Sequence, residues 1–360
     1  MAATVGLVAG AGNGGDGPPR SEPAREERTP PPTRGLPLER QVGSLLLMSY
    51  DGPEVPEYIL RRLREGQGAG VILFGPNAPD AETVRESTSQ VQRAGGGAAL
   101  VATDQEGGDI RSLAFAPPES SQAGLSSPDA AASAARDGAR ALRDAGVNVN
   151  LGPVADVAET PDSVVAGRAF PGDTEEVAGL VVTSVKAHAR ERVAATIKHF
   201  PGLGGATENT DDVSVTVDAP RDELERGALN AFRAGVSGGA PLVMASHALY
   251  PALDGEAIAS QSRPVLEDLL RGELQFDGAV VTDSIEAQAV LDRSDVATAA
   301  ERSVAAGVDL VLMTGSGSWN LIYPRLLRRA RRDAAFRKRV TESADRVLAL
   351  KRRLGLTVSP

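Results

Sequence analysis

The chain has 360 residues, a length that suits one α/β barrel with insertions. Its net charge of −10 excludes a general electrostatic attraction to nucleic acid or to an anionic membrane surface. Because the sequence has no cysteine, disulfides, thiolate catalysis and cysteine-bound metal are excluded. Only three histidines and four lysines occur, so their positions are informative.

Residues 1–39 differ in composition from the rest of the chain. The segment Met1–Gly12 is small and apolar, and Asn13–Arg34 is rich in Gly, Pro, Arg and Glu without any apolar period. The second composition is typical of a disordered linker, and the first is similar to the end of a secretory hydrophobic region. We therefore expect a disordered N-terminal extension, the remnant of a signal or anchor, and a location in the cell envelope or outside the cell rather than in the cytoplasm.

A glycine pattern in this extension has the spelling of a nucleotide-binding motif. Gly10, Gly12 and Gly15 read GxGxxG, which indicates a dinucleotide site only between a strand and a helix. Pro18 and Pro19 follow instead of a helical pattern, so we expect no dinucleotide cofactor. No later segment approaches the ~20 apolar residues that cross a bilayer.

Residues 40–357 alternate between short apolar runs and longer helical stretches, and we expect a single domain there. The runs are too short for helices and lack polar alternation, as in parallel strands covered on both faces. Eight strands with helical crossovers favour a closed (β/α)8 barrel of the TIM type. The runs are Gly43–Ser49, Gly70–Phe74, Ala98–Thr103, Asn148–Leu151, Ala194–Lys198, Pro241–Ser246, Gly278–Thr282 and Asp309–Thr314.

Helix boundaries are marked between these runs. Ser127 precedes Pro128 at one helix start, and Ser262 precedes another helix with Pro264 in its first turn. A last helix is expected at about Phe336–Leu354, where it would complete the ring around the barrel. No tight Asn-Gly hairpin and no long period-2 alternation appear, so antiparallel pairing is not expected.

Two groups of basic side chains are expected to face solvent. The arginine-rich stretches at 325–332 and 337–339 alternate with apolar residues at helical spacing, which is typical of a solvated helix face. His188 lies on a predicted helix close to Lys186 and Arg190, and we expect it to be exposed as well.

Ionisable residues follow the predicted strands at the ends where barrel enzymes carry their chemistry. Asp104 follows the third strand, Lys198 and His199 the fifth, His247 the sixth, and Asp283 the seventh. Each residue alone could be an ordinary strand end satisfied by the backbone. Together they predict one pocket mouth that is lined from four strands.

These residue types suit a neutral, hydroxyl-rich substrate, because charged donors and acceptors form the stronger hydrogen bonds. Asp283, kept ionised by nearby cations, could attack an acetal carbon as in retaining glycosidases. No metal-ligand spacing such as HExxH and no GxSxG elbow occurs. We expect no metal and no cofactor.

At these residues the sequence resembles the N-terminal barrel domain of glycoside hydrolase family 3, and within it the single-domain bacterial β-N-acetylhexosaminidases. The resemblance runs from about residue 40 to 355. Its markers are GVILFG at 70–75, ATDQEGG at 102–108, GPVADV at 152–157, RAF at 168–170, KHFPG at 198–202, MASHALYP at 244–251 and VVTDS at 280–284.

The resemblance implies roles for individual residues. Asp283 matches the catalytic nucleophile, and Asp104 matches the carboxylate that binds sugar hydroxyls. Arg168, Lys198 and His199 match further sugar-binding residues, and His247 lies in a family motif. The family places another sugar-binding arginine four residues beyond the double glycine. Here Ser112 occupies that place and Arg111 stands one residue earlier, so Arg111 is the candidate.

The sequence departs from the family at the proton donor. The resemblance implies Asp-Ser-His on a mobile loop after KHFPG, with the histidine as general acid/base, but this chain reads Asn209-Thr210-Asp211. Asp211, Asp212 or Glu208 could take over that role if burial raises its pKa. Alternatively, the proton comes from elsewhere, or catalysis is lost and a sugar-binding protein remains.

We therefore expect an exo-acting retaining glycosidase that cleaves terminal β-linked sugars, with β-N-acetylglucosaminides as first choice and β-glucosides as the alternative. Asp283 and Asp211 would be catalytic, and the partner would be an oligosaccharide or glycoconjugate such as a peptidoglycan fragment. One rival is a sugar-binding envelope protein. A second is a Schiff-base aldolase using Lys198, with phosphate held at 315–317.

Overall fold

The computed structural model describes residues 1–4, 6, 33 and 35–357. The glycine motif therefore lies outside the described residues, as do most of the predicted disordered extension and most of the possible signal remnant. No helix in the described ranges combines the length and apolar character that crossing a membrane requires.

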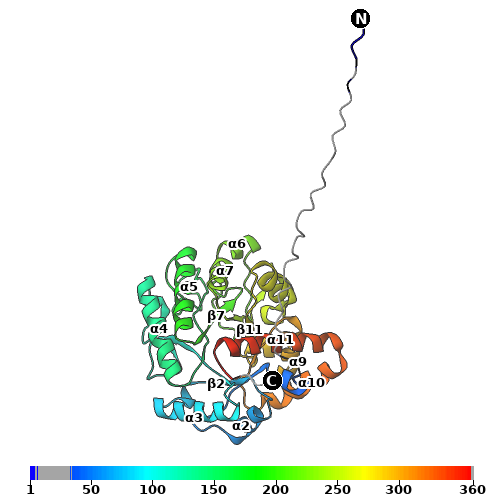
Figure 1. Ribbon diagram of the computed structural model, residues 1–360. Coiled ribbons are helices and arrows are strands. Elements are labelled where there is room, and N and C mark those ends of the chain that lie inside the picture. Colours follow the sequence, from blue (N-terminus) through cyan, green and yellow to red (C-terminus); the bar gives the residue numbers. More distant parts are fainter. Residues whose placement is uncertain (5, 7–32, 34, 358–360) are drawn as a thin grey trace. The chain divides into compact units, whose positions relative to one another are not determined.

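The predicted barrel is confirmed (Figure 1). Seven of the eight apolar runs contain a whole strand, and the fifth barrel strand begins with its run at Ala194 but extends two residues beyond it, to Phe200. The parallel strands follow the order β11-β8-β7-β6-β3-β2-β1-β12, and a parallel bridge between Val281 and Leu310 joins the two end strands. The strands are β1 (Leu46–Met48), β2 (Gly70–Leu73), β3 (Leu100–Thr103), β6 (Val149–Asn150), β7 (Ala194–Phe200), β8 (Leu242–Ala245), β11 (Ala279–Thr282) and β12 (Val311–Leu312).

Helices cover the outside of these strands (Figure 1). The α-helices are α1 (Leu38–Gly43), α2 (Glu57–Arg64), α3 (Ala81–Ala94), α4 (Pro128–Asp144), α5 (Thr174–Arg190), α6 (Arg221–Arg226), α7 (Ala228–Ser237), α8 (Gln288–Leu291), α9 (Val296–Ala306), α10 (Ser318–Arg332) and α11 (Ala334–Arg353). Short 3-10 turns lie at Gly75–Asn77, Gln122–Gly124 and Ala259–Gln261.

Strand residues alternate between two apolar clusters, as the period of two requires. In β8, Leu242 and Met244 belong to the cluster inside the barrel, whereas Val243 and Ala245 pack against the surrounding helices. The inner cluster also contains Val347 of α11, which lies across the barrel in Figure 1. The last helix therefore does more than complete the ring, because one face of it joins the inner core.

The helix starts confirm one predicted cap and modify the other. The Ser127 side chain accepts a hydrogen bond from the amide of Ala130 at 3.3 Å, and α4 begins at Pro128. Ser262 Oγ also accepts from Val265 N at 3.2 Å, but the N-cap position belongs to Arg263, and the helix Pro264–Glu273 has π geometry.

Two short antiparallel hairpins were not expected from the sequence. One pairs β4 (Gln105–Gly107) with β5 (Ile110–Arg111), and the other pairs β9 (Leu249–Tyr250) with β10 (Asp254–Ile258). The first hairpin follows β3 directly and is held by Gln105, whose side-chain amide donates to the carbonyls of Leu113 and Ala116. Three of these four strands have only two or three residues, and the five-residue β10, DGEAI, lacks a regular apolar and polar alternation, so no period-2 signal arises.

The prediction that His188 is exposed is wrong. The residue is 4% exposed, and its ring contacts Ser184 O through Nδ1 at 2.9 Å and Asn150 Nδ2 through Nε2 at 3.0 Å. Ser184 and His188 lie four residues apart on the inner face of α5, while Lys186 and Arg190 lie on the outer face. Neighbours in sequence were therefore a poor guide to the environment of His188.

The solvated-face interpretation of the arginine-rich stretches is also wrong for one residue. The Arg339 side chain is 12% exposed and pairs with the fully buried carboxylate of Asp309 at 2.7 Å. Arg271 and Arg346 reach the same carboxylate at 2.6 Å and 3.3 Å. This four-residue cluster links the segment before β12 to the helix Pro264–Glu273 and to α11.

Candidate active site

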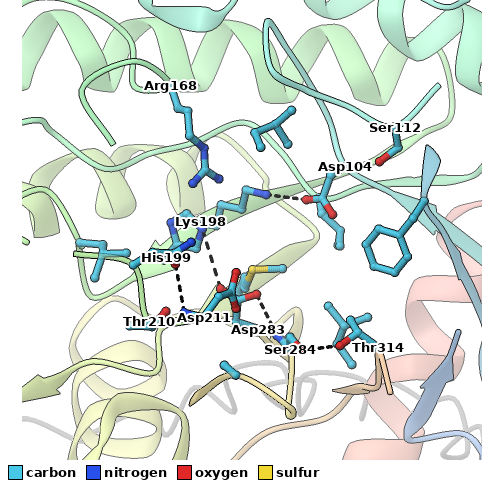
Figure 2. A pocket seen from close by; sticks show the side chains of 18 of the residues that line it. Asp104, Ser112, Arg168, Lys198, His199, Thr210, Asp211, Asp283, Ser284 and Thr314 are labelled. Carbon is cyan, nitrogen blue, oxygen red and sulfur yellow. Dashed lines mark hydrogen bonds and ion pairs between the residues drawn. The ribbon is translucent and has the colours of Figure 1, made fainter. Parts of the chain in front are cut away.

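A cavity of about 690 Å³ opens at the C-terminal ends of the barrel strands (Figure 2). Leu151, Met244 and Leu312 supply apolar lining at the ends of three strands. The structure brings seven of the predicted site residues to this cavity, namely Asp104, Arg111, Arg168, Lys198, His199, Asp211 and Asp283. The predicted convergence of strand-end residues on one pocket is therefore observed, except for His247.

A buried ion cluster forms one wall of the cavity. Lys198 Nζ lies 2.7 Å from Asp104 Oδ1 and 2.6 Å from Glu106 Oε1. Arg168 binds the same Glu106 with two parallel hydrogen bonds of 2.9 and 2.7 Å. Such forked, charge-assisted contacts hold both partners in one orientation. Two cations are thus fixed at the wall, with Asp104 beside them.

The electrostatics of this cluster keep the lysine charged. Burial by itself would lower the pKa of Lys198, but Asp104 and Glu106 outweigh it and hold the pKa above its usual value. Burial likewise opposes ionisation of Glu106, yet Lys198 and Arg168 lower its pKa to about 2. A Schiff base requires a neutral amine, so this environment speaks against the aldolase alternative.

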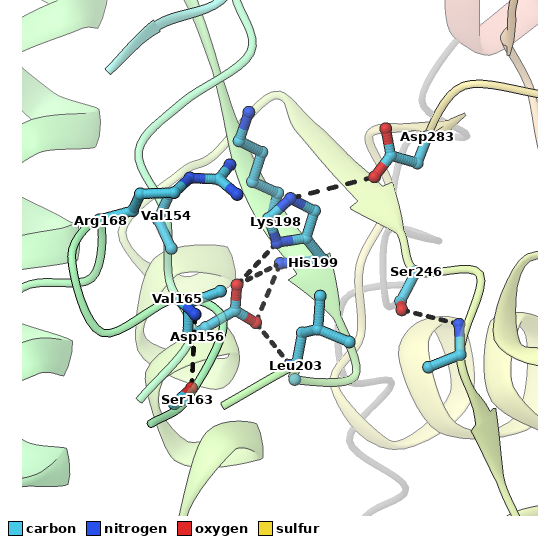
Figure 3. Close-up of polar contacts among 12 residues, drawn as sticks. Val154, Asp156, Ser163, Val165, Arg168, Lys198, His199, Leu203, Ser246 and Asp283 are labelled. Carbon is cyan, nitrogen blue, oxygen red and sulfur yellow. Dashed lines mark hydrogen bonds and ion pairs between the residues drawn. The ribbon is translucent and has the colours of Figure 1, made fainter. Parts of the chain in front are cut away.

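His199 lies between two carboxylates (Figure 3). Its Nδ1 is 2.7 Å from Asp156 Oδ2, and its Nε2 is 4.0 Å from Asp283 Oδ2. The Asp156 carboxylate also accepts the amides of His199, at 3.1 Å, and of Leu203, at 2.7 Å. Because Asp156 only accepts when ionised, the ring carries its proton on Nδ1 toward Asp156. Asp156 thereby orients Nε2 toward the cavity.

His247 does not line the cavity with the other predicted residues. It is fully buried, with Nε2 at 2.9 Å from the carbonyl of Ser284 and Nδ1 at 2.7 Å from Ser260 Oγ. The carbonyl can only accept, so Nε2–H donates and Nδ1 accepts from the serine hydroxyl. Burial lowers the pKa of His247. Its position suits holding the chain beside Asp283 rather than contacting a sugar.

Asp211 is the only one of the three acidic candidates on the loop that lines the cavity, among the residues that the structure describes. All three acidic side chains are exposed to solvent, but Glu208 and Asp212 are not part of the cavity wall. The loop is attached by backbone hydrogen bonds, in which Ala289 N donates to Thr210 O and Gln288 N donates to Asp211 O, both at 3.1 Å. At the position where the resemblance implies a histidine, a carboxylate therefore lines the pocket.

The two candidate catalytic carboxylates have opposite environments. Burial raises the pKa of Asp211, and the negative charge of Asp283 raises it further. Burial would also raise the pKa of Asp283, but the neighbouring His199 and Lys198 shift it below its usual value. One carboxyl group is thus biased toward the protonated form and the other toward the anion. This divergence is the pattern expected of an acid and nucleophile pair.

The first hairpin carries Arg111, the candidate for the sugar-binding arginine that the resemblance implies one residue later, at Ser112. Arg111 and Ser112 both line the cavity, as do Asp109 and Phe74. The shift of arginine by one residue has therefore not removed it from the cavity.

Three buried or half-buried residues of the site were missed in the sequence. Glu106 and Asp156 make no strand-end signal of their own, although they lie inside the quoted segments ATDQEGG and GPVADV. Glu286 lies three residues after Asp283, lines the cavity and accepts a hydrogen bond from Thr314 N at 2.8 Å. Their hydrogen-bond and ion-pair partners, Arg168, His199 and Thr314, come from distant segments and are known only from the structure.

A closed parallel barrel with two carboxylates of opposite pKa shift and fixed cations at its strand ends is consistent with the architecture of a glycosidase. The model of the glycosyl hydrolase family 3 N-terminal domain matches residues 38–350. The chain belongs to glycosyl hydrolase family 3.

Known proteins support this assignment. A β-hexosaminidase of Xanthomonas oryzae pv. oryzae is 33% identical over 279 residues, covering 75% of this chain and 83% of the relative. An uncharacterized secreted glycosyl hydrolase of Arthroderma benhamiae is 32% identical over 90% of this chain and 96% of its own length.

Solved structures give the same result. A β-N-acetylhexosaminidase from Beutenbergia cavernae superposes with a TM-score of 0.80 at 33% identity, covering 88% of this chain and 98% of that one. A family 3 β-N-acetylglucosaminidase from Paenibacillus sp. has a TM-score of 0.84 at 31% identity, covering 89% of this chain, which spans 63% of that longer protein. The chain is a glycosidase similar to the β-N-acetylhexosaminidases.

Proposed function

We propose that the protein is an exo-acting retaining glycosidase that removes terminal β-linked N-acetylglucosamine through a covalent sugar ester on Asp283. The opposite pKa shifts of Asp211 and Asp283 in one cavity carry this proposal. The names of the Xanthomonas and Beutenbergia relatives support the choice of an N-acetylhexosamine.

In the first step Asp283 attacks the anomeric carbon, and the bond between that carbon and the leaving oxygen breaks. Asp211, protonated at the start, donates its proton to the leaving oxygen. In the second step the Asp211 carboxylate removes a proton from water, and this water displaces Asp283 with its electron pair. The charge of Lys198 and the ring of His199 favour the anionic form of Asp283 throughout.

Substrate binding is assigned to the cavity wall that the buried ion cluster forms. Asp104 and Lys198 present an acceptor and a donor that are already paired with one another at 2.7 Å, so both are held in place for sugar hydroxyls. Arg168, fixed by Glu106, and His199, fixed by Asp156, complete this binding set, and Arg111 is placed on the hairpin side of the cavity.

The test is a panel of aryl β-glycosides with the wild type and Asp283→Ala. We expect hydrolysis of the N-acetylglucosaminide above the glucoside, loss of hydrolysis in the variant, and a first product with the β configuration in the NMR spectrum. A higher kcat/KM on the glucoside than on the N-acetylglucosaminide would identify the protein as a β-glucosidase instead. If wild type and variant bind the sugar equally and neither hydrolyses it, the protein is a sugar-binding module instead.

We also infer that the protein acts in the cell envelope or outside the cell, on oligosaccharides or peptidoglycan fragments. This location is supported by the Arthroderma relative, which is named as secreted. Fractionation of cells producing the full chain, followed by detection with an antibody, tests it. Recovery in the cytoplasmic fraction alone would contradict it.

A further inference from the structure

A second cavity of about 300 Å³ lies at the opposite end of the barrel, where helices end and strands begin. Its walls come from the segments that lead into β1, β2 and β3 and from the last turns of α11. Four charged side chains line it, and all are cationic: Arg40, Arg64, Arg93 and Lys351. Among the described residues, no acidic side chain lines it.

Lys351 is the unusual member of this group. The residue is 6% exposed, and its Nζ donates one hydrogen bond, of 2.8 Å, to the carbonyl of Ala69. Burial lowers the pKa of Lys351 to about 8, and no carboxylate counteracts that effect. A buried cation without a paired anion is costly. The ammonium group has three donors, so its geometry leaves capacity for a further acceptor.

The arginines at the rim add positive charge that local structure does not cancel. Arg64 pairs with the exposed Glu57, whereas no ion pair of Arg40 or Arg93 occurs among the described residues. The C-termini of α1, α2, α3 and α11 face this region and each carries about −0.5 charge. The partial charges of these four helix ends sum to about −2. The four cationic side chains carry +4, of which one charge is paired with Glu57. An excess of positive charge therefore remains around the cavity.

We propose that this cavity binds a small phosphate-type oxyanion, either inorganic phosphate or a phosphomonoester, on Lys351 with Arg40 and Arg93 at its rim. A lysine acts as a point charge for phosphate, and arginine adds a forked donor pair. The volume corresponds to about ten water molecules at ~30 Å³ each, so a phosphate with a small organic substituent fits. The site is separate from the glycosidase cavity, and the proposal does not depend on the sugar specificity.

The test measures binding of inorganic phosphate to the full chain by titration calorimetry, together with the melting temperature at constant ionic strength. Glycerol phosphate and acetate serve as the phosphomonoester and carboxylate probes. Lys351→Met removes the charge and keeps a long apolar side chain, and Arg93→Gln is the second variant. Arg352→Gln is the matched control, because it removes an exposed charge from the same helix turn outside the cavity.

We expect phosphate to bind the wild type and Arg352→Gln equally and to raise their melting temperatures. The affinity should fall about 10- to 100-fold in Lys351→Met, as for loss of a charge-assisted hydrogen bond, and also fall in Arg93→Gln. Hydrolysis of aryl glycosides should stay unchanged in Arg93→Gln. The proposal is overturned if phosphate does not bind, if acetate binds as tightly, or if Arg93→Gln binds like the wild type.

Discussion

The backbone amide of Gln288 donates a hydrogen bond of 3.1 Å to the carbonyl of Asp211. Gln288 lies five residues after Asp283, so the loop with the candidate acid is attached to the segment that follows the candidate nucleophile. Ser214 Oγ adds a second attachment, to Asp292 Oδ2 at 2.7 Å. The distance between the two carboxyl groups is therefore controlled by contacts that involve no catalytic side chain.

Asp211→Asn should reduce kcat about 10²- to 10⁴-fold on substrates with poor leaving groups, because general acid catalysis is lost. Aryl glycosides with good leaving groups should lose less in the first step, since they need little protonation. Asp212→Asn is the control, as this carboxylate lies on the same loop outside the cavity wall. Equal losses in both variants would indicate damage to the loop rather than loss of an acid.

The pH dependence of kcat/KM should be bell-shaped. Activity requires protonated Asp211 and ionised Asp283, so it should fall above the raised pKa of Asp211 and below the lowered pKa of Asp283. Asp211→Asn should remove the alkaline limb on a substrate with a good leaving group. Persistence of that limb in the variant would assign the acid to another residue.

Asp156→Asn should lower kcat more than it raises KM. The asparagine can no longer offer two acceptors to His199 Nδ1 and to the amides of His199 and Leu203, so the ring loses its fixed orientation toward Asp283. Leu203→Ala trims the apolar side chain there without changing the acceptors and is the control. An unchanged pH profile with lost stability alone would reduce Asp156 to a structural residue.

Stability should decrease as the pH falls below about 6.5, the usual pKa of histidine. Burial lowers the pKa of both His188 and His247 in the folded state, so the unfolded chain binds more protons in this range. The free energy of unfolding then rises with pH there. Urea denaturation at pH 5.5 and 7.5 measures this, and His188→Gln should have a smaller difference than the wild type.

Asp309→Asn should destabilise the fold by about 3–5 kcal/mol, because it leaves Arg271, Arg339 and Arg346 around a neutral side chain. Asp333→Asn is the comparison, since asparagine caps a helix about as well as aspartate and the change should cost well under ~1 kcal/mol. Chemical denaturation of both variants distinguishes these values. Similar small losses would mean that the buried cluster contributes little.

The sequence by itself determined the barrel, its eight strands and most of the cavity. Buried parallel strands have a recognisable composition, and barrel chemistry occurs at strand ends, so Asp104, Lys198, His199 and Asp283 could be placed together before any coordinates. The departure at Asp211 was equally visible, because it depends only on residue order.

Tertiary structure alone decided which polar residue faces what. His188 is buried, and His247 is buried in contact with the carbonyl of Ser284 instead of lining the cavity. Of the three acidic loop residues, Asp211 lines the cavity, whereas Glu208 and Asp212 do not. Glu106, Asp156 and Lys351 acquired their partners from segments 62, 43 and 282 residues away. Burial and charge pairing depend on such long-range contacts, which local composition and periodicity do not encode.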